Sequence, residues 1–196
     1  MTRPSNGNVV TLRKQVSDAL VQLGYRRHGR AHVRRIDDDF SVCVDTGPTG
    51  SRTDIAPYVG IRSDAVERAR ADLMSLPDDE WTGTVGANVG YVVGGEYRWW
   101  NEGARLQPIV DDILRALEWF KPYMSLRTIA DVFTFEWASS NPGAPYALVV
   151  IALLNGDSTL VADRLAHAES ILCVRADEVC NQFRAFEARV RGRCGR

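Results

Sequence analysis

The sequence carries almost no net charge. It holds 25 acidic and 24 basic residues, so its formal net charge at neutral pH is −1. Proteins dedicated to binding nucleic acid usually show a strong basic excess. The balance therefore argues against that class of protein, although it leaves room for a local basic patch. Lysine is also scarce, at Lys14 and Lys121 only. Nearly all the positive charge belongs to arginine, which forms planar bidentate contacts and stacks on aromatic rings.

Long apolar runs are missing as well. The longest, from Ala147 to Leu154, is far shorter than the roughly 18 residues that a helix needs to cross a bilayer. Residues 1–8 are polar and do not contain the apolar core of a signal peptide. We therefore expect a soluble protein of the cytoplasm that does not contact a membrane.

Histidine and cysteine are too few or too scattered to predict a metal site. The only histidines are His28, His32 and His167, and no CxxC motif is present. The sequence accordingly predicts neither a metal nor a cofactor. Since nothing marks a secreted chain, the four cysteines are expected to be reduced thiols. Cys173 and Cys180 are expected to lie on one face of a helix, as small hydrophobic residues.

Local catalytic motifs are absent too. There is no nucleophile elbow and no Ser-His-Asp set or carboxylate pair with a usable context. The glycines at 83–86 and 94–95 lack the Lys-Ser/Thr of a phosphate loop, and no Rossmann spacing follows a strand into a helix. The sequence favours a protein without enzymatic activity. An enzyme with a dispersed site that includes His32 stays an alternative.

The apolar patterns predict strands in the first half of the chain and helices mostly in the second. Helical spacing covers 9–23, 64–76, 106–120, 126–137, 146–154, 158–173 and 175–190, and strand patterns cover 31–36, 40–44, 54–61, 84–93 and 97–100. Gly86 and Gly90 indicate a bulge or a closely packed segment. We expect one α+β domain over 9–190, with an antiparallel sheet packed against helices, and flexible termini at 1–8 and 191–196.

The densest polar feature is the basic stretch 26–35. Because side chains alternate along a strand, Arg30, His32 and Arg34 share one face, and the small apolar residues between them face the helices. That polar face could grip a phosphate or an acidic partner. Alternatively, it is a solvated face whose arginines are balanced by the acidic run 37–39, since antiparallel sheets commonly leave one face wet.

A second feature is aromatic and comprises Tyr91, Tyr97, Trp99 and Trp100. Two adjacent tryptophans on a strand point to opposite faces, so one of them is expected to be displayed while the other is buried. Exposed tryptophan and tyrosine contribute strongly to binding. The alternative is that these side chains fill the core.

Five segments together resemble a known family. They are Leu23–Arg30, Val33–Arg35, Tyr58–Ile61, Tyr97–Trp100 and Tyr146–Asp157. Over about residues 12–169, their order is similar to that of the bacterial domain of unknown function 4304 family. It begins with a helix, a Leu-Gly-aromatic turn and basic residues before a strand. The resemblance implies an α+β fold, no established activity, and an association with immunity proteins that neutralise toxins.

These observations predict a non-enzymatic protein-binding module, and the resemblance implies an immunity-type or defence-associated role with a protein partner such as a toxin. Its expected contacts are Arg30, His32, Arg34, Tyr97 and Trp99, because arginine and aromatic residues dominate binding hot spots. The alternative is a binder of nucleic acid or nucleotide through the strand 30–35, for which affinity would fall steeply with salt. The sequence leaves the oligomeric state open.

Overall fold

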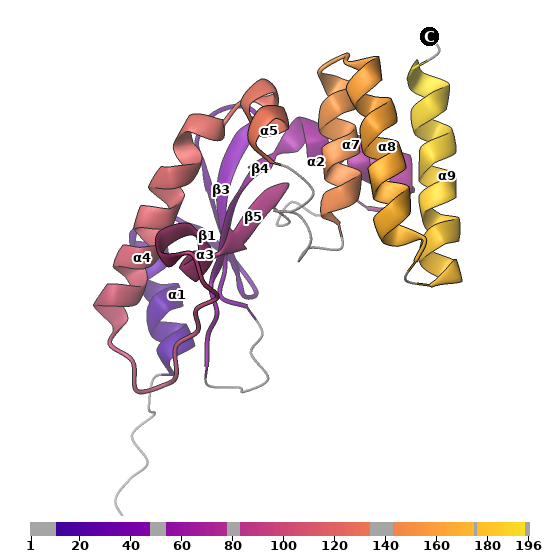
Figure 1. The fold of residues 1–196 in the computed structure, drawn as a ribbon. Coiled ribbons are helices and arrows are strands. Elements are labelled where there is room, and N and C mark those ends of the chain that lie inside the picture. The colour runs from indigo at the N-terminus through magenta and orange to yellow at the C-terminus, as the bar shows by residue number, and fades with distance from the viewer. Residues whose placement is uncertain (1–10, 48–53, 78–82, 134–142, 175, 195–196) are drawn as a thin grey trace, which may run out of the picture. The chain divides into compact units, whose positions relative to one another are not determined.

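The computed structural model describes residues 11–47, 54–77, 83–133, 143–174 and 176–194. These residues contain a five-stranded antiparallel sheet and eight α-helices, most of them in the C-terminal half, which confirms the predicted α+β class (Figure 1). The chain forms two compact units. The first comprises Met1–Arg34, Cys43–Val59 and Ala87–Trp119, and the second comprises Arg35–Val42, Gly60–Gly86 and Phe120–Arg196.

Each strand of the sheet lies beside its neighbour in the sequence. The strands are β1 (Arg26–His28), β2 (Ala31–Arg35), β3 (Phe40–Asp45), β4 (Tyr58–Ser63) and β5 (Val85–Asn88), in the order β1-β2-β3-β4-β5. Residues 37–39 form the turn of the β2–β3 hairpin, where the Ile36 N–H donates to the Phe40 carbonyl at 2.9 Å. The Asp37 carboxylate accepts the N–H groups of Asp39 and Phe40, which is how aspartate stabilises tight turns.

Two strand predictions need correction. The strand expected over 84–93 ends at Asn88, and α3 (Val89–Gly94) follows it. Residues 97–99 are not in a strand, and only Trp100 pairs, in a single bridge with Ile55. The Asn88 side chain accepts the Gly90 N–H at 2.9 Å and so begins a helix. Short apolar runs do not distinguish strand from helix by their period, which is why the pattern misled.

In the first unit, α1 (Leu12–Gln22) packs on β1, and α4 (Leu106–Phe120) lies beside the strands (Figure 1). The α1 face toward the sheet buries Leu12, Val16 and Leu20, which recur at the helical spacing. Gly24 follows α1 with φ of +86°, a left-handed conformation that carries no Cβ penalty for glycine.

In the second unit, the helices are α2 (Asp64–Met74), α5 (Leu126–Val132), α7 (Ala144–Leu154), α8 (Ser158–Leu172) and α9 (Asp177–Cys194), with a 3-10 turn, η1, at Lys121–Tyr123. Helix α7 packs against α2, α5 and α8, while α9 packs against α2 and α8 (Figure 1). Every residue from Ala144 to Ala152 is buried, so α7 is the central buried helix that its apolar sequence predicts.

One prediction about cysteine is wrong. Cys173 and Cys180 form a disulfide with a Cα–Cα separation of 4.2 Å, so they are neither reduced nor on one helix. Helix α8 ends at Leu172 and α9 begins at Asp177. The helical spacing of the two cysteines therefore carries no meaning, because the chain turns between them.

The described ranges contain neither a membrane-spanning helix nor a metal-binding cluster. No helix there combines the length and the apolar character needed to span a membrane. Within the same ranges, no group of three or more His, Cys, Asp or Glu side chains is arranged to hold a metal ion.

Candidate functional site

The structure buries His32 instead of displaying it. Only 1% of His32 is exposed, and its Nε2 atom lies 2.8 Å from the Ser17 hydroxyl of α1. The expectation that His32 lies on an open face is therefore wrong. His32 is buried because α1 covers this side of β2, so the face that carries His32 is the covered one.

The Ser17–His32 pair resembles the nucleophile and base of a hydrolase in composition only. Ser17 is 2% exposed, so a substrate has no access to its hydroxyl. Burial and then the nearby Arg27 charge lower the pKa of His32, which keeps the imidazole neutral. We interpret the pair as a buried hydrogen bond that joins α1 to the sheet.

The two arginines predicted beside His32 have partners within the chain. Arg30 is exposed, and its Nε donates to the Asp45 carboxylate at 3.0 Å. The Arg34 guanidinium lies over the Tyr25 ring, 4.8 Å from the ring centroid. Burial raises the pKa of the Tyr25 hydroxyl, against the opposing effect of the Arg34 charge. Arg34 therefore covers a buried tyrosine, whereas Arg30 stays at the surface.

The aromatic residues, by contrast, are displayed. We call residues 88–100, from the start of α3 to Trp100, the aromatic loop. Tyr91, Tyr97 and Trp99 are 49%, 50% and 55% exposed. Tyr91 and Tyr97 meet edge to face, with their ring centroids 6.1 Å apart. Trp100 is half-buried, so the neighbouring tryptophans differ in exposure even though they are not in a strand.

A buried asparagine holds the aromatic loop in place. Asn88 is fully buried, and its side-chain oxygen accepts the N–H groups of Gly90 at 2.9 Å and Arg98 at 2.8 Å. Its amide donates to the Arg98 carbonyl at 2.9 Å. One side chain thus fixes both the start of α3 and the backbone between Tyr97 and Trp99. Sequence reasoning missed Asn88, although asparagine before a short apolar run is a helix-start signal.

The far end of the aromatic loop is fixed by three further contacts. Arg98 forms an ion pair with Asp112 of α4 at 2.9 Å, and its guanidinium lies 6.0 Å from the Trp100 ring centroid. Ile55 and Trp100 exchange both backbone hydrogen bonds, at 2.8 and 2.9 Å. The loop is therefore bound at its start, middle and end.

Gly90 explains why residues 96–98 of the aromatic loop can pack so closely on α3. A Cβ atom at this position would collide with the Glu96 carbonyl and with Arg98. The close approach that the sequence predicts at Gly90 is confirmed, although Gly90 lies in a helix and not in a strand.

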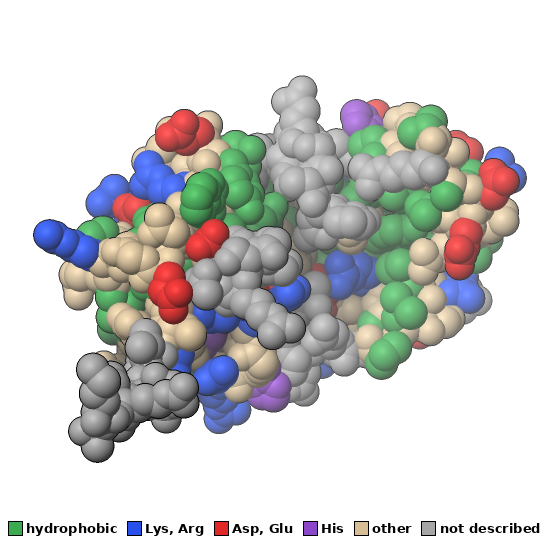
Figure 2. Space-filling view, turned by 90° about the horizontal axis from the view of Figure 1, so that it is seen from below, with side chains coloured by type: hydrophobic (Ala, Val, Ile, Leu, Met, Phe, Trp, Pro, Cys, Tyr) green, Lys and Arg blue, Asp and Glu red, His purple; other side chains and the backbone are tan. Residues whose placement is uncertain are grey.

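Arg30 and the aromatic loop lie at the same end of the sheet. The Thr46 N–H donates to the Arg30 carbonyl at 3.3 Å, and Gly47 packs on the Ala56 backbone. Ile55 in turn pairs with Trp100. Segments 43–47 and 54–57 thus separate Arg30 from the loop. On the face that Figure 2 draws, the surface charge is mixed, with Lys and Arg side chains interspersed with Asp and Glu.

Comparison with known proteins gives no relatives. No family model, no curated protein and no solved structure matches the chain. The resemblance to the domain of unknown function 4304 family therefore stays a prediction.

Proposed function

We propose that the protein binds another protein through the aromatic loop. The observation that carries this proposal is the exposure of Tyr91, Tyr97 and Trp99 on a backbone that Asn88 holds from within. Tryptophan and tyrosine are the residue types most enriched in binding hot spots. A loop that is already ordered loses little conformational entropy on binding, so more of the contact energy appears as affinity.

The neighbouring charged residues fit the edge of such a surface. Arg30 is exposed at the same end of the sheet and would lie outside the aromatic centre. The buried His32 is not part of the proposed contact. The partner that we propose is a toxin, which gives the protein an immunity-type role, and this choice rests on the family resemblance alone.

The proposal is tested with a purified chain that carries Tyr97→Ser and Trp99→Ser. The unaltered protein is used to recover partners from an extract of the host, and the recovered protein is then purified and titrated calorimetrically. We expect the double variant to bind that partner at least about tenfold more weakly, because each hot-spot truncation typically costs more than about 1 kcal/mol. Leu76→Ser is the matched control, because Leu76 is 51% exposed but lies outside the loop.

Two results would count against the proposal. One is recovery of no protein partner at native expression level. The other is equal affinity of the double variant and the unaltered chain for the recovered partner. Circular dichroism of each variant separates a loss of contact from a loss of fold.

A basic strand supports a second candidate, the binding of nucleic acid. All three residues of β1, Arg26, Arg27 and His28, are exposed at the end of the strand order. With Arg30 beside them, they would contact phosphates. We would then expect the affinity for single-stranded DNA to fall with salt, and the double substitution Arg26→Gln with Arg27→Gln to reduce that slope by about 2. Absence of binding at low salt rejects this candidate.

A cytoplasmic location is also a proposal, and it rests on the composition of the sequence. The Cys173–Cys180 disulfide bears on it, since such bonds persist mainly in oxidising compartments. Alkylation of freshly lysed cells with and without a reductant measures the thiol state. Free thiols at both positions in the native host would agree with the cytoplasm, whereas a stable disulfide would favour another compartment.

A further inference from the structure

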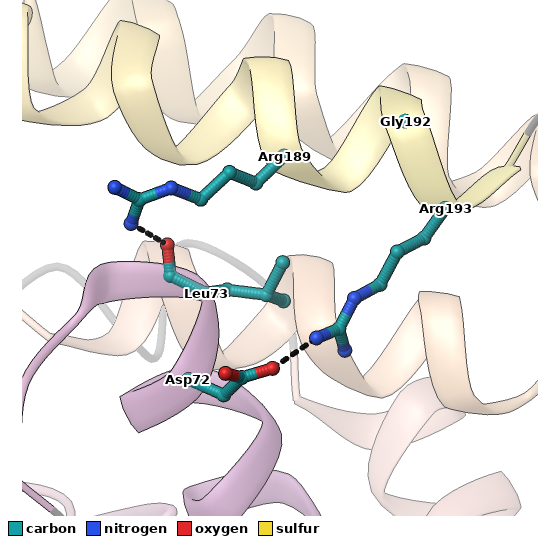
Figure 3. A pocket seen from close by; sticks show the side chains of 5 residues that line it. All are labelled: Asp72, Leu73, Arg189, Gly192 and Arg193. Carbon is teal, nitrogen blue, oxygen red and sulfur yellow. Dashed lines mark hydrogen bonds and ion pairs between the residues drawn. The ribbon is translucent and has the colours of Figure 1, made fainter.

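The second unit contains a pocket between α2 and α9 that is unrelated to the aromatic loop. It has a volume of about 510 Å³ and is lined by Asp72, Leu73, Arg189, Gly192 and Arg193. Figure 3 shows both arginine side chains reaching from α9 across to α2, with the Leu73 side chain between them. The two arginines are four residues apart, so they lie on the same face of α9. The volume falls within the usual range for small-molecule sites.

The two arginines are held in position by α2. Arg189 donates from Nη1 to the Leu73 carbonyl at 2.6 Å, which occupies one of its five N–H groups. Arg193 forms an ion pair with the Asp72 carboxylate. Two guanidinium groups and one carboxylate leave the lining with one net positive charge. Leu73 is buried, and Gly192 places no side chain in the space.

We propose that this pocket binds a small molecule that carries a phosphate monoester. Planar guanidinium groups match phosphate oxygens bidentately, and two of them face one space here. The Asp72 side chain is 68% exposed and the Arg193 side chain is 45% exposed, and ion pairs this open contribute little to stability. The Asp72 carboxylate therefore stands where a ligand oxygen would go and is readily displaced by a dianion.

The test measures binding of phenyl phosphate and of inorganic phosphate by NMR titration at constant ionic strength. We expect dissociation constants of about 1 mM or below for phenyl phosphate and weaker binding of inorganic phosphate, which fills less of the pocket. Arg193→Gln should weaken phenyl phosphate at least about tenfold, since it removes a charged hydrogen-bond donor. Asp72→Asn should tighten it about threefold or more, because the competing carboxylate is gone.

The controls distinguish an effect on folding from an effect on phenyl phosphate binding. Arg193→Gln removes only an exposed ion pair, so it should melt close to the unaltered protein, whereas Arg189 also holds the end of α2. Arg115 is an exposed arginine that pairs with Asp112 in the first unit, and Arg115→Gln should leave the binding of phenyl phosphate unchanged. The proposal is overturned if phenyl phosphate does not bind, if Arg193→Gln binds it as tightly as before, or if Asp72→Asn weakens it. The proposal does not rest on the aromatic loop, and the loop variants should bind phenyl phosphate normally.

Discussion

At the scale of single residues, His32 makes the stability of the protein depend on pH. Burial and the Arg27 charge lower its pKa in the folded state, while Asp45 acts in the opposite direction. Between the folded and unfolded pKa values, the unfolded chain binds more protons. The contribution of His32 to the free energy of unfolding is therefore fully present above about pH 6.5. It falls as the pH drops below that value, by up to about 1.4 kcal/mol per pH unit.

Urea unfolding between pH 7.5 and pH 5 measures this effect, because most carboxyl groups titrate below about pH 5. His32→Gln should flatten the dependence while lowering stability at pH 7.5, where it disturbs the hydrogen bond to Ser17. An unchanged slope in His32→Gln would assign the dependence to other groups.

His32 also shows why sequence reasoning placed some residues wrongly. Strand alternation put Arg30, His32 and Arg34 on one face, but it does not say which face a helix covers. The answer depends on α1, which precedes the strand and meets His32 through Ser17. The sequence identifies Tyr97 and Trp99 as candidates, but it does not identify Asn88, the residue that holds them in place. The four hydrogen bonds of Asn88 join it to Pro57, Gly90 and Arg98, and a local sequence pattern does not reveal contacts with residues as distant as Pro57 and Arg98.

At the scale of elements, the contact between α3 and residues 96–98 of the aromatic loop depends on Gly90. Alanine is intrinsically better than glycine inside a helix by about 1 kcal/mol. Overpacking costs about 1–3 kcal/mol, however, and the atoms that a Cβ would meet at Gly90 are mostly backbone. Because the Cβ would lie far inside contact distance of the Glu96 carbonyl oxygen and of the Arg98 Cβ, the overpacking cost belongs at the upper end of that range. After the helix gain is subtracted, we expect Gly90→Ala to destabilise the protein by about 1–2 kcal/mol, as measured by urea unfolding.

Gly103→Ala is the matched control, since a Cβ there would meet only the Asn101 side chain at an ordinary distance of 3.5 Å. Its expected effect is within about 0.5 kcal/mol. Because Gly90→Ala displaces the segment next to Tyr97, it should also weaken the partner binding that we propose for the aromatic loop. Equal stability of the two alanine variants would contradict the close packing of residues 96–98 on α3.

At the scale of the whole molecule, neither compact unit is a continuous piece of chain. The second unit draws α2 from residues 60–86, although its other helices come from residues after 119. Helix α7 is buried on every side up to Ala152, and α2 is one of the helices that cover it. A fragment of residues 120–196 would leave part of α7 exposed to water.

We expect that fragment to be poorly ordered or to aggregate, since exposed apolar patches of this kind drive association. The readouts are dispersion of its NMR spectrum and its state of association in sedimentation, with the full chain as the reference. A monomeric fragment with a well-dispersed spectrum would show that α7, α8 and α9 need no cover from α2.

The predicted α+β class was within reach of the sequence because apolar patterns report which residues are buried. The helix at 106–120 follows an amphipathic period, and the uniformly apolar run 146–154 marks the buried helix α7. The disulfide was not within reach, because its two cysteines become neighbours only through the turn between α8 and α9. Spacing that looks helical loses its meaning at a chain reversal.

The order of the strands has a consequence for how quickly the chain reaches its native state. Because every strand pairs with its neighbour in the sequence, sheet formation requires mostly short loops to close, and the β4–β5 connection is the one in which the described residues include a helix. Chains whose contacts are close in sequence fold faster than those that must join distant segments. The sheet should therefore assemble by successive hairpin additions, so that a newly synthesised chain can form β1 to β4 before the C-terminal helices have been made.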